Sequence, residues 1–333
     1  MSNAGVSVIL PVHNAAATVR RAVQSILDQT HAELELIIVD DGSTDETPHQ
    51  ILSLRDPRIR FRRIDHQGVV VASHVAVDAA QFNLIARMDA DDIAWPDKLR
   101  QQRLWMERHG LDVVGCQVRI LNEDGTSSSA MRRYQTWINT ETLSSDDLLQ
   151  LRYVELPLVN PTILARRHYF EPGYQQSDLP EDYDLMLTAA AEGMLFGKVP
   201  EVLFDWYDGR HRLTRRDDRY SPAAFDRCRL KHLLAGPLSQ HTEVDLWGLG
   251  RTGRQWFRHL THSGCRIRRV IEINPDRIDT FYKNTPIIDA MELNEYDGTP
   301  MIIAVGTAGA RPLIRSHLNV RGFAVGTNAL FVA

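Results

Sequence analysis

Three aspartates lie within four consecutive positions after an apolar stretch. They are Asp89, Asp91 and Asp92, and residues 83–88 before them have the composition of a buried strand. Carboxylates crowded at a strand end repel one another, and a divalent cation offsets this repulsion. Oxygen ligands suit Mg²⁺ or Mn²⁺, which keep further positions for water and a substrate phosphate. We therefore predict a metal-assisted reaction of a phosphate-bearing substrate; the alternative is a solvated acidic loop.

Polar side chains also follow three other segments that are typical of buried strands, residues 6–12, 34–39 and 58–64. In an open α/β sheet, ligands bind beyond the carboxyl ends of the strands. We therefore expect these strand ends to form one pocket that holds a base, a ribose and phosphates in sequence. The residues at these ends are Pro11, His13, Asn14, Asp40, Asp41 and Gly68.

The strands must be positioned by the helices between them. Apolar residues recur with helical spacing over residues 16–27, and we also predict helices over residues 47–54, 68–80 and 96–109. Alternation of strand and helix predicts an α/β fold, with a parallel sheet covered by helices on both faces. Beyond residue 110 the pattern changes. Residues 113–121, followed by Glu123-Asp124-Gly125, predict a strand and a hairpin turn, and residues 208–220 predict a charged, mobile loop.

A polar, Gly- and Pro-containing stretch near residue 237 predicts a domain boundary, with domains over residues 1–237 and 238–333. In the second domain, Gly248, Gly250 and Gly253 follow an apolar strand and open a helix. Glu272 lies 19 residues after Gly253, at the end of the next strand. This is the context of a dinucleotide-binding fingerprint. The alternative is a Rossmann-like module kept for packing, dimerisation or acceptor docking, since fold alone establishes no cofactor.

Four motifs together resemble one known family. They are Pro-Val-His-Asn at residues 11–14, Val-Asp-Asp-Gly-Ser-Thr-Asp at 39–45, Asp-Ala-Asp-Asp at 89–92 and Glu-Asp-Tyr-Asp at 181–184. In this order and spacing, residues 5–235 resemble a family 2 glycosyltransferase with the GT-A fold, a mostly parallel, doubly wound sheet. The resemblance implies an inverting transfer of a sugar from a nucleotide diphosphate to a hydroxyl acceptor, as a hexosyltransferase performs it.

The resemblance also implies roles for single residues. Asp91 would ligate Mn²⁺ or Mg²⁺ between the two phosphates, and Asp89 would face the ribose or the metal. The acceptor hydroxyl needs a general base, and Asp182 is our candidate. The residues implied in nucleotide binding are Pro11, His13, Asn14, Asp40, Asp41, Gly68, Asp89, Ala90 and Arg212, and those implied at the acceptor site are Glu181, Trp206 and His211.

Each of these assignments has a structural alternative. Asp40 and Asp41 could form only a turn and a helix cap, and His13 could be a packed histidine at a strand end. Glu181 and Asp182 could only favour a helix N-terminus. Trp206 could belong to the core, and the basic stretch at residues 210–216 could be a solvated run of charge. Ser73 and His74 stand where the family usually carries an Arg-Asn pair, which leaves the donor contacts there open.

Composition excludes several classes. The 333 residues carry a net charge of −5, whereas nucleic-acid binding favours a basic stripe. The three cysteines are far apart, which predicts reduced thiols and a cytoplasmic protein. No run approaches the roughly 20 apolar residues of a membrane span. We expect a protein without transmembrane segments, at most peripheral to the inner membrane face, and allow for a homodimer.

Family precedent favours a UDP-sugar donor and a bacterial surface glycan or its lipid-linked precursor as acceptor. Two other functions stay open. A nucleotidyltransferase would begin with a Gly-rich, basic loop after the first strand, which residues 11–17 lack. A nicotinamide-dependent oxidoreductase would rest on the glycines and Glu272 of the second domain. A degenerate transferase that only binds glycans is a third, weaker alternative.

Overall fold

The computed structural model describes residues 5–140, 144–155, 157–209 and 212–333. The chain divides into two compact units. The first comprises residues 1–148 and 157–225, and the second comprises residues 149–156 and 226–333. The sequence predicts two domains that meet near residue 237, and this boundary stays a prediction.

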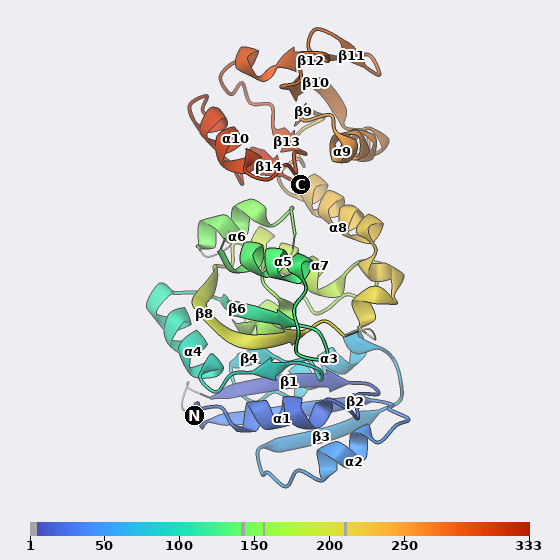
Figure 1. The fold of residues 1–333 in the computed structure, drawn as a ribbon, viewed down its shortest axis with the longest axis vertical. Helices are drawn as coiled ribbons and strands as arrows, with labels where there is room; N and C mark the ends of the chain where they lie inside the picture. The colour runs from blue at the N-terminus through green and yellow to red at the C-terminus, as the bar shows by residue number, and fades with distance from the viewer. Residues whose placement is uncertain (1–4, 141–143, 156, 210–211) are drawn as a thin grey trace. The chain divides into compact units, whose positions relative to one another are not determined.

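The first unit is built on an eight-stranded sheet (Figure 1). Its parallel part carries the strand ends that the sequence analysis singled out, because β1 pairs with both β2 and β4 and β2 pairs with β3. β7 is antiparallel to β4 and to β6, so the sheet is mixed and not wholly parallel. In spatial order the strands are β3 (Ile59–Ile64), β2 (Leu34–Asp41), β1 (Val6–Val12), β4 (Leu84–Arg87), β7 (Leu164–Arg166), β6 (Val113–Leu121), β8 (Phe196–Tyr207) and β5 (Ile93–Ala94).

The central strands β1 and β2 are buried at every position, which explains their nearly unbroken apolar sequence. Val19, Val23 and Ile26 of α1 pack in one core with Val8 and Leu10 of β1. The helices that begin in this unit are α1 (Val19–Leu27), α2 (Thr47–Leu52), α3 (Val69–Ala79), α4 (Lys98–His109), α5 (Ser129–Thr140), α6 (Ser145–Leu151), α7 (Glu181–Ala191) and α8 (Pro222–Ala235).

One prediction for this unit fails. The hairpin after β6 is wrong: the turn at Asn122–Thr126 exists, but it leads into α5, and β6 pairs with β7 and β8 instead. The charged segment near residues 208–220 contains two 3₁₀ turns, Leu213–Arg215 and Asp218–Tyr220, and α8, which no pattern predicted, follows it.

The second unit has a six-stranded sheet in the order β11-β12-β10-β9-β13-β14. The pairs from β12 to β14 are all parallel, and only β11 is antiparallel to its neighbour. The elements are β9 (Glu243–Trp247), α9 (Arg251–His262), β10 (Arg266–Glu272), β11 (Phe281–Tyr282), β12 (Thr285–Asp289), β13 (Met301–Ile303), α10 (Ala310–Asn319) and β14 (Ala329–Phe331). Strands β11, β12 and β14 were not predicted.

No helix in the described ranges has both the length and the apolar character needed to cross a bilayer.

Candidate active site

The acidic cluster stands directly after β4, as the sequence predicts. Asp89, Asp91 and Asp92 each place one carboxylate oxygen within 4.8 Å of the others. Asp92 is fully buried, and its Oδ1 accepts a hydrogen bond of 2.8 Å from the main-chain N–H of Tyr207. Its Oδ2 is buried without a hydrogen-bond partner among the residues that the structure describes. A concentration of oxygen atoms with an unsatisfied buried member suits a hard divalent cation.

Burial and mutual repulsion act together on this cluster. Burial raises the pKa of Asp91, and the charge of Asp89 raises it further. The pKa of Asp92 rises well above its usual range, because the side chain is buried and Asp91 is its neighbour. A cation or an arginine at this place would stabilise the ionised carboxylates.

Arg87 fixes the first member of the cluster. Its Nε and Nη2 donate to Asp89 Oδ1 at 3.0 and 2.9 Å, and its Nη1 donates to Ser73 Oγ at 2.8 Å. Arg87 is buried, and the charge of Asp89 contributes to its raised pKa. Ser73, which stands where the family's usual pair is missing, therefore supports the acidic cluster through Arg87.

Two arginines flank Asp91. Arg212, predicted from the basic stretch, lowers the pKa of Asp91 through its charge and stacks its guanidinium 4.7 Å from the ring centre of Trp206. Arg21 of α1 was not predicted; its Nη2 donates to the main-chain oxygen of Asp91 at 2.8 Å. The only sequence signal for Arg21 was its place in the helix after the first strand.

Asp182 lies in the first turn of α7 and is partly buried. Burial, helped by the charge of Glu181 and then of Asp89, raises the pKa of Asp182 to about 7, and Arg87 opposes the rise. The charges of Asp89 and Arg87 both act on Asp182, so the base candidate lies near the acidic cluster. A carboxylate that titrates near neutral pH is suited to take a proton from a hydroxyl.

Glu181 is buried and bonded to the chain that follows β8. The hydroxyl of Tyr220 lies 2.6 and 2.7 Å from the two carboxylate oxygens of Glu181, and Arg219 lies 4.0 Å away. This contact ties the Asp218–Tyr220 turn to the N-terminus of α7. Tyr220 is a residue that sequence reasoning missed, because nothing in the local pattern marks its partner 39 positions earlier.

The end of β2 is held by hydrogen bonds. Asp41 accepts from the main-chain N–H groups of Gln67 at 2.7 Å and Gly68 at 2.9 Å, so its carboxylate fixes the start of α3. Gly68 has a φ of 93°, a conformation that favours glycine. Asp40 is fully buried, accepts from the N–H of Ser43 at 3.1 Å, and pairs with Arg63 at 3.3 Å.

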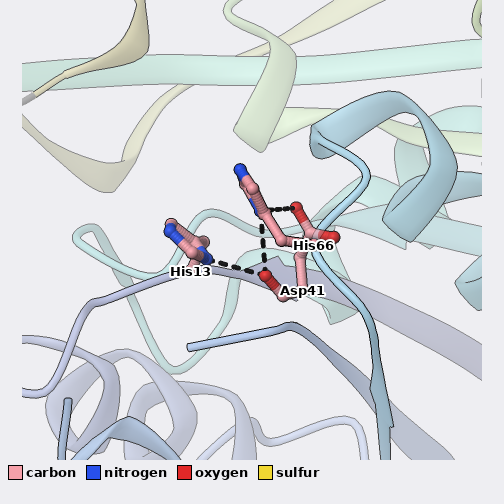
Figure 2. Close-up of side chains that lie close together, drawn as sticks. All are labelled: His13, Asp41 and His66. Carbon is pink, nitrogen blue, oxygen red and sulfur yellow. Dashed lines mark hydrogen bonds and ion pairs between the residues drawn. The ribbon is translucent and has the colours of Figure 1, made fainter. Parts of the chain in front are cut away.

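Two imidazole rings meet at this strand end (Figure 2). His13 and His66 stack with ring centres 4.2 Å apart and planes inclined by 25°. Their Nδ1 atoms lie 2.7 and 3.0 Å from the same main-chain oxygen of Asp41. Because a carbonyl oxygen only accepts, both Nδ1 atoms carry their protons in this arrangement. His13 was predicted and His66 was missed, although it follows the third predicted strand.

Comparison with known proteins identifies the family to which this part of the chain belongs. The model of the glycosyl transferase family 2 matches residues 7–171, which include the strand ends and the acidic cluster. This part of the chain belongs to glycosyl transferase family 2. The remaining members of the site, α7 and the segment after β8, lie beyond the matched range but inside the same compact unit.

The names of two similar curated proteins refer to O-antigen and succinoglycan biosynthesis, and that of a third refers to glucosyl transfer. The O-antigen biosynthesis glycosyltransferase WbnJ of Escherichia coli is 26% identical over 230 residues, 67% of this chain and 85% of WbnJ. The succinoglycan biosynthesis protein ExoO of Rhizobium meliloti is 29% identical over 207 residues, 56% of each chain. The UDP-Glc:alpha-D-GlcNAc-diphosphoundecaprenol beta-1,3-glucosyltransferase WfgD of Escherichia coli is 32% identical over 120 residues, 36% of this chain and 47% of WfgD. The match thus spans about half the length of ExoO and of WfgD.

Solved structures identify the fold of the glycosyltransferase unit as GT-A. TarS of S. aureus in complex with UDP has a TM-score of 0.53 at 18% identity, covering 70% of this chain and 66% of that one. The complex of TarS with UDP-GlcNAc has a TM-score of 0.54 at 16% identity, covering 78% and 80%. At this level of identity the likeness concerns the fold alone.

The other residues predicted for the glycosyltransferase site fall in different surroundings. Asn14 is exposed, and its main-chain N–H donates to Ser43 Oγ at 2.9 Å. Pro11 is buried in β1, Ala90 packs against the core, and Trp206 lies partly buried 6.2 Å from the ring of Tyr134. His211 lies outside the described residues.

The glycine fingerprint lies in the second unit, apart from the family match. α9 packs directly on the turn after β9, because a Cβ on Gly253 would lie 2.0 Å from the main-chain oxygen of Gly248. At Gly250, which opens the helix, a Cβ would meet no atom within 4 Å. Glu272 at the end of β10 accepts from the N–H groups of Ile273 at 2.9 Å and Leu249 at 3.3 Å, and pairs with Arg277 at 3.2 Å.

Proposed function

We propose that this glycosyltransferase moves a hexose from a nucleotide diphosphate sugar, a UDP-sugar by preference, to the hydroxyl of a glycan or lipid-linked glycan, with inversion. One observation carries the proposal. The pKa of Asp182, raised to about 7, suits a general base. The charge of Asp89, a member of the acidic cluster, contributes to this rise, so the two side chains lie near each other. A base close to a diphosphate site is what a single displacement at the sugar carbon requires.

The leaving-group side would be built from the acidic cluster and its arginines. Asp91, together with Asp89, would hold Mn²⁺ or Mg²⁺, a cation that neutralises charge on a departing diphosphate. The buried, unsatisfied Oδ2 of Asp92 supports a cation at this place. Arg212 and Arg21 lie beside Asp91 and add fixed positive charge toward the phosphates. Arg87 keeps Asp89 in place.

The acceptor side would depend on Asp182. Its carboxylate takes the proton of the acceptor hydroxyl as the oxygen attacks the sugar carbon from the face opposite the diphosphate. The bond to the leaving oxygen breaks through an oxocarbenium-like state, and the configuration inverts. Trp206, Glu181 and His211 stay candidates for the acceptor site. The bond between Tyr220 and Glu181 favours a positioning role for Glu181.

The nucleoside would lie at the ends of β1, β2 and β3. His13, Asn14 and His66 are exposed there and can reach a base, with Gly68 beside them. Pro11, Asp40 and Asp41 are buried, so we assign them to the wall and to the shape of the pocket. The names of WbnJ and ExoO favour surface-glycan synthesis, and the UDP complexes of TarS favour a uridine nucleotide.

Release of nucleoside diphosphate from a panel of nucleotide sugars, with Mn²⁺ and a mixed glycan acceptor pool, tests this function. We expect turnover of one UDP-sugar by the wild-type protein and its loss in Asp182→Asn. Turnover that is unchanged in Asp182→Asn would overturn the assignment of the base. If no donor, UDP-sugars included, is bound or consumed under these conditions, the proposed function is wrong.

A second candidate function belongs to the second unit, where the topology favours it. β9 lies between β10 and β13, so the strand order reverses at the carboxyl end of β9, where dinucleotides bind in such sheets. Gly248, Gly250, Gly253 and Glu272 occupy that end. Dinucleotide binding is tested by titration of the protein with NADH, followed by the fluorescence of the nicotinamide. No change on saturation would exclude it.

A further inference from the structure

A second group of metal-binding side chains differs from the acidic cluster in its chemistry. His13, Asp41 and His66 each offer one ligand atom within 4.8 Å of the others. The acidic cluster offers only oxygen, whereas this group offers two imidazole nitrogens. Zn²⁺ and its first-row neighbours bind imidazole well, while Mg²⁺ and Mn²⁺ prefer oxygen. We propose that His13, His66 and Asp41 form a site for a divalent transition metal, Zn²⁺ above all. This inference goes beyond the proposed function; it uses residues that the proposed function places in the nucleoside pocket, so the ion and the base would compete for them.

The spacing of the ligand atoms fits one metal ion. With metal–ligand bonds of about 2.0–2.1 Å, neighbouring ligand atoms lie about 2.9–3.4 Å apart. The main-chain oxygen of Asp41 is 2.7 Å from Nδ1 of His13 and 3.0 Å from Nδ1 of His66. Oδ2 of Asp41 is 2.9 Å from Nδ1 of His66. Each Nδ1 therefore already lies beside an oxygen of Asp41 (Figure 2), and one ligand atom from each of the three residues lies within 4.8 Å of the others.

The site is both held and accessible. The N–H groups of Gln67 and Gly68 hold Asp41 at the end of β2. Its main-chain oxygen and its Oδ2, the two oxygen ligands, are therefore already in fixed positions. The side chain of His66 is 59% exposed, which leaves a path for the ion from solvent. The two rings are stacked with their planes inclined by 25°, so binding of one ion requires them to rotate until both Nδ1 lone pairs point at it.

Metal binding requires a change of tautomer. Each Nδ1 gives its lone pair to the ion, so the neutral ring keeps its proton on Nε2. For His13 this nitrogen lies 3.0 Å from the amide nitrogen of Asn14, a donor that cannot accept a proton. Asn14→Asp would place a carboxylate there, the partner that commonly orients a metal-bound histidine. This substitution should therefore raise the affinity for Zn²⁺. If the two stacked histidines bind no metal, the substitution should leave Zn²⁺ affinity unchanged.

Calorimetric titration of the full chain with ZnCl₂, without nucleotide, tests the inference. We expect the tightest binding event to weaken about tenfold or more in His66→Gln and in His13→Gln and to tighten in Asn14→Asp. His49→Gln, a change at an imidazole that is 77% exposed, and Asp91→Asn should bind Zn²⁺ as the wild type does. Co²⁺ in place of Zn²⁺ should give visible absorption bands that His66→Gln removes.

Zn²⁺ affinity that is the same in His66→Gln, His13→Gln and His49→Gln would overturn the site, as would a wild-type protein that binds no Zn²⁺. Loss of affinity in Asp91→Asn alone would assign the ion to the acidic cluster instead. Because His13 and His66 are exposed, their glutamine variants should fold, and the far-ultraviolet circular dichroism spectrum verifies this.

Discussion

At the scale of single residues, the protonation state of Asp182 decides whether the proposed base can act. Asp182→Asn keeps the size of the side chain but removes its ability to take a proton. We expect kcat to fall about 10²- to 10⁴-fold, the usual contribution of a general base. Affinity for UDP in the presence of Mn²⁺ should be unchanged, and Asp178→Asn on the preceding loop serves as a control. A variant that keeps more than half of the wild-type kcat would contradict the role.

The raised pKa of Asp182 also predicts a pH dependence. The rate should decline as the pH falls below about 7, because the protonated carboxyl group cannot act as a base.

The folded state binds this proton more tightly than the unfolded chain, whose aspartates titrate near 4. The contribution of Asp182 to stability is therefore largest below about pH 4 and is lost as the pH rises toward 7. Urea unfolding of Asp182→Asn should lack this component, and an identical pH profile in both proteins would refute it.

Motif residues could be predicted from the sequence, but their partners could not. Asp89, Asp91 and Asp92 were predicted to lie together after a strand, and they do. Arg21, Tyr220 and His66 were not predicted, because each meets the site through a contact far away in the chain. Arg21 contacts Asp91 across 70 positions, and Tyr220 contacts Glu181 across 39. No local spacing encodes such a contact.

At the scale of elements, periodicity located the strands that carry the site. The strand ends at Val12, Asp41 and Arg87 meet at one edge because β1 pairs in parallel with β2 and β4. The hairpin after β6 failed for a physical reason. The turn residues Glu123–Gly125 are compatible with a hairpin, but the segment after them is a helix. Its residues Met131, Tyr134 and Trp137 recur at helical spacing and pack on the core.

A buried lysine at the start of α4 gives a prediction for stability. Lys98 is fully buried, and its Nζ has no hydrogen-bond partner among the described residues. Its Nζ lies 5.5 Å from the ring centre of Phe204. Burial lowers the pKa of Lys98 to about 8. The unfolded chain binds this proton more tightly, so the cost of burial is full below pH 8 and disappears as the pH rises past about 10.

Lys98→Met should therefore raise the free energy of unfolding at pH 7 by about 1–3 kcal/mol, the cost of an unsatisfied buried polar group. Urea titration measures the change, and the gain should shrink at pH 10. Lys198→Met is the matched control, since the buried Nζ of Lys198 donates to the main-chain oxygen of Ile138 at 2.6 Å and the variant loses that bond. A Lys98→Met protein that is less stable than the wild type would contradict this interpretation.

At the scale of the whole molecule, the chain joins a glycosyltransferase unit to a second α/β unit with its own sheet. The sequence predicted the strand, turn and helix around Gly248–Gly253 and the position of Glu272. It did not predict β11, β12 or β14, which have two to five residues each and too few positions to show a period. The packing of α9 on the turn requires one member of the glycine pattern, Gly253.

The glycines of this unit differ in what they tolerate. Gly253→Ala brings a Cβ against the main-chain oxygen of Gly248 at 2.0 Å, so α9 must shift, and we expect a loss of about 1–3 kcal/mol. Gly250→Ala meets no atom within 4 Å at a φ of −67° and should unfold like the wild type. Differential scanning calorimetry compares the two variants. Equal unfolding temperatures would show that the close packing of α9 does not contribute to stability.

Calorimetric titration with UDP, in the presence and absence of Mn²⁺, tests the central claim most directly. The claim is that the carboxylates after β4 hold a cation for the diphosphate while Asp182 serves the acceptor. We predict that wild-type protein and Asp182→Asn bind UDP with equal affinity and only weakly without Mn²⁺, and that Asp91→Asn loses the effect of Mn²⁺. UDP affinity that is independent of both Mn²⁺ and Asp91 would contradict the account.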